Sequence, residues 1–157
     1  MSTPHLIDGH NLIPKLGLSL RNADDEMELV TRLQTFCRVE RQQVEVYFDG
    51  APAGQAGTRK FGLVTAHFVR LGTTADSAIR ARLKSLGRAA RGWIVVTSDR
   101  QVQADARAAG AQVSSSDMFA RRVLEAMHAP APGPAAEAPV SEEEVEEWLR
   151  LFRENKR

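Results

Sequence analysis

The chain has 157 residues, of which 43% are hydrophobic and 26% are charged, and its formal net charge is +1. This length and balance predict one globular domain of ordinary size and exclude a disordered chain, a collagen-like repeat and a coiled-coil rod. The single cysteine, Cys37, excludes an internal disulfide and a cysteine-based zinc site, and we expect it in the core. No apolar run approaches the roughly 20 residues of a membrane helix, and no signal peptide is evident, so we expect a cytoplasmic protein with no membrane partner.

The charges are distributed unevenly along the chain. Residues 58–122 hold twelve Lys or Arg against four Asp, whereas residues 137–157 hold seven Glu against four basic residues. Arg outnumbers Lys in the first stretch, and the planar guanidinium group suits phosphate recognition. A polyanion is therefore a candidate partner, although solvated helix faces explain the same charges and are favoured by charge alone.

Apolar patterns and turn residues predict alternating strands and helices along most of the chain. Residues 11–22 and 51–60 contain Pro and Gly, so both are expected to be loops, and Asp49–Gly50 is expected to be a turn. The helix predicted at 75–86 is expected to be capped by Thr73 or Thr74, and the helix predicted at 117–127 by Ser115 or Ser116. Strands are predicted at 5–7, 44–48, 63–71, 93–97 and 111–113, and helices at about 27–40, 75–86, 100–109 and 117–127.

This order of elements predicts an α/β domain over residues 1–128, with an open, mostly parallel sheet flanked by helices. Residues 129–140 are rich in Ala and Pro, which is typical of an extended linker. Residues 141–157 begin with a capping-box pattern and are predicted to form a C-terminal helix. Its apolar stripe should dock on the domain or on a partner, because it would otherwise be exposed: Val145, Trp148, Leu149 and Phe152.

Four aspartates lie where predicted strands end. Asp8, Asp49 and Asp99 follow strands, and Asp76 opens the helix after another strand. The carboxyl ends of parallel strands share one edge of a sheet, where ligands bind. Carboxylates gathered there repel each other unless a cation compensates them, and oxygen ligands suit Mg²⁺ or Mn²⁺. Together with the Arg-rich stretch, this predicts metal-dependent cleavage of a nucleic-acid backbone.

Each aspartate also has a structural explanation. Asp49 precedes Gly50 in a turn signal, and Asp76 and Asp99 suit helix N-termini, as does Asp117. The histidines show no metal-ligand spacing. His10 is of interest because it lies between Asp8 and Asn11.

Four short motifs occur in order: Ile7–Ile13 (IDGHNLI), Val46–Gly50 (VYFDG), Thr74–Ile79 (TADSAI) and Val96–Asp99 (VTSD). Together they resemble the YacP-like branch of the NYN domains, which are PIN-like nucleases, over residues 5–128. Residues 141–152 are similar to the terminal helix of that branch. The resemblance implies a PIN-like sheet, a Mg²⁺ or Mn²⁺ site, endonucleolytic cleavage of single-stranded RNA, and association with the ribosome.

Residue by residue, the resemblance implies that Asp8, Asp76 and Asp99 bind metal. It makes Asn11 their polar partner in the first loop and Asp49 the acid after the second strand. The sequence departs from the branch at His10, where Tyr is common. It also departs at Arg80 and Val102, where Glu is common, and these losses leave fewer outer carboxylates for a second metal.

The leading hypothesis is a metal-dependent endoribonuclease acting on single-stranded RNA, which includes ribosome-associated mRNA. The alternative is an RNA- or ribosome-binding module with a weak or silent nuclease site. A haloacid-dehalogenase phosphatase is disfavoured because Asp8-Gly9-His10 lacks the Asp-x-Asp opening. The candidates for RNA contacts are Arg59 and Lys60, both in the expected mobile loop 51–60, and Arg80 and Arg100.

Overall fold

The computed structural model describes residues 3–18 and 23–129. In chain order, the elements are β1 (Pro4–Asp8), α1 (Gly9–Leu12), the 3-10 helix η1 (Ile13–Leu16), α2 (Ala23–Glu40), β2 (Gln43–Ala51), β3 (Gly57–Phe61), β4 (Val64–Arg70), α3 (Ala75–Leu86), the 3-10 helix η2 (Gly87–Gly92), β5 (Ile94–Val96), α4 (Arg100–Ala108), β6 (Gln112–Ser114) and α5 (Ser116–His128).

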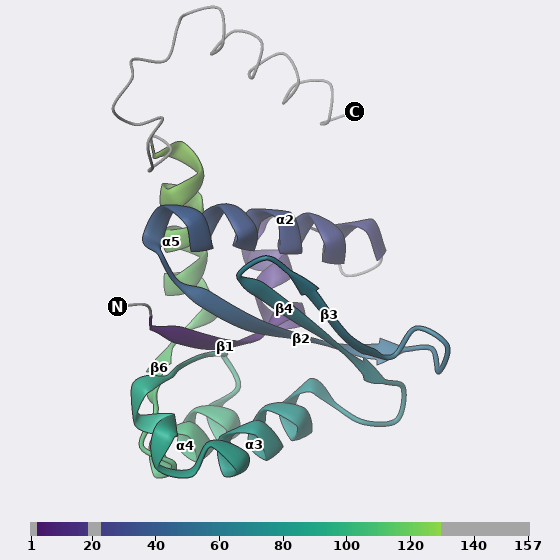
Figure 1. Ribbon diagram of the computed structural model, residues 1–157, viewed down its shortest axis with the longest axis vertical. Coiled ribbons are helices and arrows are strands. Elements are labelled where there is room, and N and C mark those ends of the chain that lie inside the picture. The colour runs from purple at the N-terminus through teal and green to yellow at the C-terminus, as the bar shows by residue number, and fades with distance from the viewer. Residues whose placement is uncertain (1–2, 19–22, 130–157) are drawn as a thin grey trace, which may run out of the picture.

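The strands form one six-stranded sheet in the order β3-β4-β2-β1-β5-β6. Neighbouring strands are parallel except for β3, which pairs antiparallel with β4. Helices α2 and α5 lie on one face of the sheet, and α3 and α4 lie on the other (Figure 1). The predicted open, mostly parallel α/β sheet flanked by helices is therefore confirmed.

Strand β1 lies between β2 and β5 and separates two hydrophobic clusters. Ile7 belongs to the cluster under α2 and α5, and Leu6 belongs to the cluster under α3. Both side chains are fully buried, as expected for a parallel strand that is covered on both faces. Cys37 is buried in the first cluster, so its predicted core position is confirmed.

The expected loop at residues 11–22 is wrong for its first part, because α1 and η1 follow β1 directly. Asp8 caps α1 through its side chain, and Pro14 lies in the first turn of η1, where its missing N–H costs nothing. Buried Leu12, Ile13 and Leu16 fasten these short helices to the core.

The expected mobile loop at residues 51–60 is also wrong in part, because β3 begins at Gly57. Its first four residues are exposed, so this edge strand lacks the apolar alternation that marks a strand in a sequence. The predicted turn at Asp49–Gly50 is wrong as well. Strand β2 continues through these two residues with a register irregularity, and Gly50 adopts a φ of +81° there.

Two predicted helix caps agree with the structure: Thr74 caps α3 and Ser115 caps α5. Helix α2 begins at Ala23, earlier than the predicted start near residue 27. The predicted linker at 129–140, apart from its first residue, and the predicted C-terminal helix at 141–157 lie outside the described residues, so the domain boundaries stay predictions. Within the described ranges, no helix combines the length and apolarity needed to cross a membrane.

Candidate active site

Four aspartates meet at the carboxyl edge of the parallel strands. Asp8 is the last residue of β1, and Asp49 lies near the end of β2. Asp76 is in the first turn of α3, after β4, and Asp99 caps α4, after β5. The chain leaves β1 toward β2 on one side of the sheet and later adds β5 on the other side, so this edge contains the topological switch point where α/β proteins bind ligands.

Asp8 is the most buried of these acids, with 5% of its surface exposed. Its two carboxylate oxygens accept hydrogen bonds from Asn11, at 3.4 Å from the backbone N and 3.1 Å from Nδ2. Burial raises the pKa of Asp8 to about 6, and the neighbouring carboxylates of Asp76 and Asp49 add to this shift. The fold thus holds a carboxylate in a place where its negative charge is unfavourable.

Asp76 shares this electrostatic environment. Its pKa is raised by burial and by the carboxylate of Asp99, and a hydrogen bond with the carboxyl group of Asp8 opposes the rise. The carboxylate of Asp76 therefore interacts with the carboxylates of both Asp8 and Asp99. These three acids, which the family resemblance assigned to metal binding, are brought together by the fold.

Asn11 joins two of the strand ends. While its amide nitrogen donates to Asp8, its Oδ1 accepts a hydrogen bond of 3.0 Å from the backbone N of Ser98, just before Asp99. Asp99 uses Oδ1 for both capping bonds, from the backbone N atoms of Gln101 (2.8 Å) and Val102 (3.1 Å). Its Oδ2 accepts no hydrogen bond from the described part of the protein, so this oxygen is the one available to a ligand.

Gly9 is required by the close approach of α1 to β2. A Cβ atom at this position would lie 2.5 Å from Cε1 of Phe48 and 2.9 Å from the carbonyl oxygen of Tyr47. Any side chain here would push the start of α1 away from β2. The small residue after Asp8 is thus needed to keep Asp8 and Asp49 at the same edge.

His10 connects two carboxylates from distant parts of the chain. Its Nδ1 lies 2.7 Å from Oδ1 of Asp49, and its Nε2 lies 2.8 Å from Oε2 of Glu26, in the first turn of α2. These partners, Glu26 foremost, raise the pKa of His10 although the ring is half-buried. Sequence reasoning singled out His10 but missed Glu26, because the only signal for Glu26 was an acidic helix start.

The sequence matches the model of the YacP-like NYN domain over residues 5–152. The chain belongs to the YacP-like NYN domain family. Two similar solved structures are crystal structures of Rae1 (YacP) from Bacillus subtilis. A point mutant has 24% sequence identity and a TM-score of 0.64, covering 82% of this chain and 78% of that one. The other has 21% identity and a TM-score of 0.59, covering 97% and 82%. No curated protein sequence matches significantly.

The acids of this YacP-like NYN domain suit a hard divalent cation by their chemistry. All are oxygen donors, and the pKa of Asp8 is raised first by burial and then by the neighbouring carboxylates of Asp76 and Asp49, a charge that a cation would compensate. Among the described residues, however, no three or more His, Cys, Asp or Glu side chains are already arranged as a metal-binding group. The residues thus fit the ion by chemistry and by electrostatics, without forming a finished ligand set.

The four basic candidates for RNA contacts divide into two pairs. Arg80 and Arg100 are exposed and lie close to the acids, Arg80 one helical turn after Asp76 and Arg100 directly after Asp99. Arg80 is also paired, with its Nε 2.6 Å from Oδ2 of Asp105.

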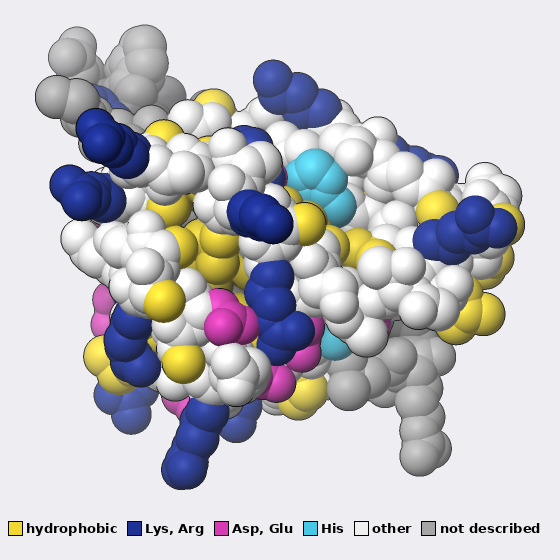
Figure 2. Space-filling model, turned by 90° about the horizontal axis from the view of Figure 1, so that it is seen from below, with side chains coloured by type: hydrophobic (Ala, Val, Ile, Leu, Met, Phe, Trp, Pro, Cys, Tyr) yellow, Lys and Arg dark blue, Asp and Glu magenta, His cyan; other side chains and the backbone are white. Residues whose placement is uncertain are grey.

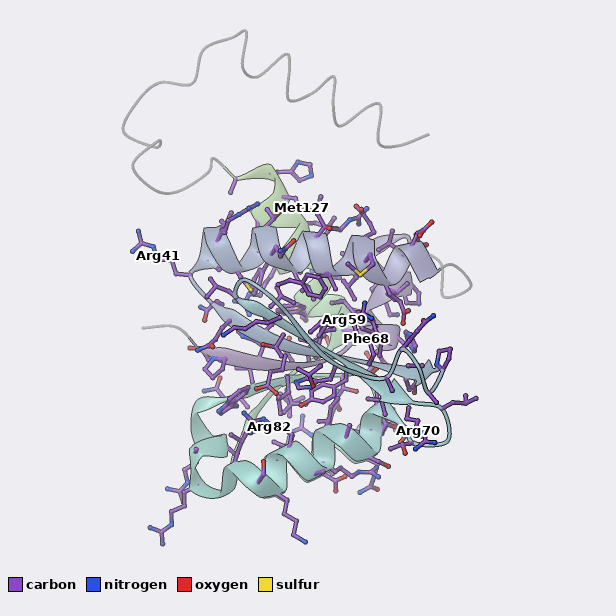
Figure 3. The ribbon with its side chains drawn as sticks, turned by 45° about the vertical axis from the view of Figure 1, so that its right-hand side comes forward. Arg41, Arg59, Phe68, Arg70, Arg82 and Met127 are labelled. Atoms are coloured by element: carbon purple, nitrogen blue, oxygen red, sulfur yellow. The ribbon has the colours of Figure 1, made fainter. Side chains whose placement is uncertain are left out.

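Arg59 and Lys60 are instead on the edge strand β3. They lie opposite Ala66 and Thr65 in the amino-terminal half of β4, away from the carboxyl edge of the parallel strands. The Arg59 guanidinium lies 5.4 Å from the ring centre of Phe68 (Figure 3). The structure therefore does not bring this pair next to the acids.

The surface around α3 and α4 shows how the charges are arranged. Figure 2 looks at the molecule from this side, and its Lys and Arg side chains are spread over the view, several at the margin and some near the centre beside the acids. A small group of acidic side chains lies among them, nearer the centre of the view. On this face the excess of basic residues is dispersed and does not form one continuous basic patch.

Proposed function

We propose that this protein is a metal-dependent endoribonuclease that cleaves single-stranded RNA, with Mg²⁺ or Mn²⁺ as its cofactor. The observation that carries the proposal is the buried carboxylate of Asp8, whose pKa is raised to about 6 beside Asp76 at the switch point of the sheet. Carboxylates held close together destabilise the fold unless a bound cation compensates their charge. Membership of the YacP-like NYN family supports ribonuclease activity as the use of that cation.

In this proposal Asp8, Asp76 and Asp99 hold the ion, with the free Oδ2 of Asp99 facing the ligand. The bound ion would bind the phosphate and lower the pKa of a water molecule. Asn11 serves the reaction by keeping Asp8 and the loop before Asp99 in fixed positions through its two hydrogen bonds. Asp49 is assigned a supporting role, because its Oδ1 is already occupied by His10.

RNA would be attracted by the dispersed basic residues, with Arg100 and Arg80 nearest to the acids. Arg59 and Lys60 on β3 are candidates for contacts with a more distant part of the strand. Binding through phosphates should weaken steeply with salt, because each contact releases counterions. The family resemblance extends the proposal to ribosome-associated mRNA as the natural substrate.

Cleavage of a fluorescent single-stranded RNA in Mn²⁺ or Mg²⁺ tests the proposal. Asp99→Asn should keep the α4 cap, since an asparagine Oδ1 accepts the same two hydrogen bonds, yet lose at least about 100-fold in kcat. A calorimetric titration should show a parallel loss of Mn²⁺ affinity. Asp117→Asn is the matched control, because Asp117 is also in a first helical turn but pairs with Lys15 at 3.1 Å.

A silent RNA-binding module is the second candidate, and the lack of a finished ligand set among the described residues favours it. It predicts salt-sensitive RNA binding without metal-stimulated cleavage. Full cleavage by Asp99→Asn at unchanged metal dependence would reject the metal-binding assignment of Asp99.

A further inference from the structure

A chain of side-chain contacts links helix α2 to the start of α3 through His10. Glu26, from the first turn of α2, lies 2.8 Å from Nε2 of His10. The opposite ring nitrogen lies 2.7 Å from Oδ1 of Asp49. The other oxygen of Asp49, Oδ2, accepts a hydrogen bond of 3.5 Å from the backbone N of Ala75, the first residue of α3 and the neighbour of Asp76.

The burial of this chain shows that it is built into the fold. The side chains of His10 and Glu26 are 26% and 24% exposed, and that of Asp49 is 41% exposed. The His10 ring also packs against Phe48, at 5.7 Å between ring centres. Exposed ion pairs contribute little, but a ring held by packing and by two short hydrogen bonds has a defined orientation.

The contacts of His10 with Glu26 and Asp49 orient the carboxylate of Asp49. Strand β2 has a register irregularity between Phe48 and Ala51, so its backbone pairing with β4 is interrupted where Asp49 stands. The sheet therefore does not by itself fix this side chain, and His10 supplies the missing constraint. Ala75 is buried, so its N–H depends on Asp49 for a partner.

We propose that His10, held by Glu26, is a positioning residue that fixes Asp49 and thereby sets the start of α3 and the place of Asp76 beside Asp8. The inference rests on the proposed nuclease function for its catalytic consequence. Its structural part concerns only contacts within the protein. None of the three linked side chains needs to touch RNA or metal for the effect.

The variants that test this are His10→Phe and Glu26→Ala, with Glu26→Gln as the conservative replacement. Phenylalanine keeps the ring beside Phe48 but removes both hydrogen bonds. Glutamine can donate to or accept from Nε2 of His10, so it should preserve the chain. Glu28→Ala is the matched control, because Glu28 is in the same helix and, among the described residues, pairs only with Arg32, at 3.2 Å.

Amide hydrogen exchange in metal-free protein gives a measurement that does not depend on activity. The Ala75 amide should exchange about 5- to 10-fold faster in His10→Phe and in Glu26→Ala, relative to the amide of Val95 in β5, which reports general destabilisation. Glu26→Gln should change this ratio less than threefold, and Glu28→Ala should leave it unchanged. A ratio that stays at the wild-type value in both His10→Phe and Glu26→Ala overturns the proposal.

Cleavage kinetics give the catalytic test. With Mn²⁺ and single-stranded RNA, Glu26→Ala should lower kcat about 5- to 20-fold while KM for RNA stays within twofold. The double variant His10→Phe/Glu26→Ala should be no worse than His10→Phe alone, because both changes break one chain. Additive losses would overturn the proposal. If the wild type cleaves no RNA with Mn²⁺ or Mg²⁺, the proposed function fails, and the exchange ratio of Ala75 still decides the role of His10.

Discussion

Replacing Asp8 by Asn should make the metal-free protein more stable at neutral pH. The pKa of Asp8 rises from 3.8 to about 6 in the folded protein, so ionised Asp8 destabilises the fold by about 3 kcal/mol above pH 6. Asn removes that charge and still caps α1. It sacrifices one of the two hydrogen bonds from Asn11, which costs about 1 kcal/mol. The expected net gain is about 2 kcal/mol.

The sign of this gain depends on pH. A carboxyl group with a raised folded pKa is neutral in both states below pH 3.8, and its contribution to stability is lost as the pH rises through 6. Urea unfolding in a chelating buffer should therefore show Asp8→Asn as the more stable protein at pH 8. At pH 4 it should be the less stable protein, by about the value of the lost hydrogen bond.

Divalent metal should reverse the result at pH 8. At a concentration 100 times its Kd, a bound ion stabilises the wild type by about 2.7 kcal/mol, which matches or exceeds the gain expected for the variant. Asp117→Asn, with a side chain 66% exposed, should change stability by less than about 0.5 kcal/mol under every condition. A pH-independent difference between wild type and Asp8→Asn would refute the reasoning from the raised pKa of the buried Asp8.

Three further changes test other parts of the fold. Gly9→Ala should cost about 1–3 kcal/mol in urea unfolding, because its Cβ would overlap Phe48, and a neutral effect would contradict the close approach. Arg41→Gly should raise stability by about 0.5–1 kcal/mol, since Arg41 has a φ of +54°, and a loss in thermal unfolding would show a hidden contact of the side chain. Burial and then Arg122 lower the pKa of His5 to about 4, so protonation of His5 should lower the stability of the wild type by about 3 kcal/mol between pH 7 and pH 4. His5→Leu should abolish this loss of stability, and an unchanged pH profile would disprove the reasoning.

Most of the sheet and its helices were predictable because each element carries a local signal. Strand β1 has the apolar residues Leu6 and Ile7 directly before the turn signal Asp8-Gly9, and α3 has a capping threonine followed by apolar residues at helical spacing. Strand β3 carries no such signal. Its first four residues are exposed and two of them are charged. The strand exists because β4 offers an edge and Gly62, with a φ of +64°, allows the turn between them.

The candidate site was predictable in part for the same reason. Asp8 ends β1 and Asp99 comes shortly after β5, and parallel strands place such residues at one edge. The contact of Glu26 with His10 was not predictable, because it depends on how the first turn of α2 packs beside α1. The separation of Arg59 from the acids was hidden as well, because it follows from the antiparallel direction of β3.

Strand β1 carries two groups whose titrations oppose each other. On acidification from pH 7 to 4, protonation of Asp8 should add about 3 kcal/mol to stability, while the buried imidazole of His5 should remove about the same amount. The wild-type profile should therefore be nearly flat for these two groups, and flatness alone would hide both. Asp8→Asn should expose the loss caused by His5, and His5→Leu should expose the gain caused by Asp8. The double variant should lack both contributions, because the two side chains titrate independently at opposite ends of the strand, and should keep the pH dependence that the raised pKa values of His10 and Asp76 add to the wild type. If Asp8→Asn shows the profile of the double variant, His5 is not held at its lowered pKa. If His5→Leu shows that profile, Asp8 is not held at its raised pKa.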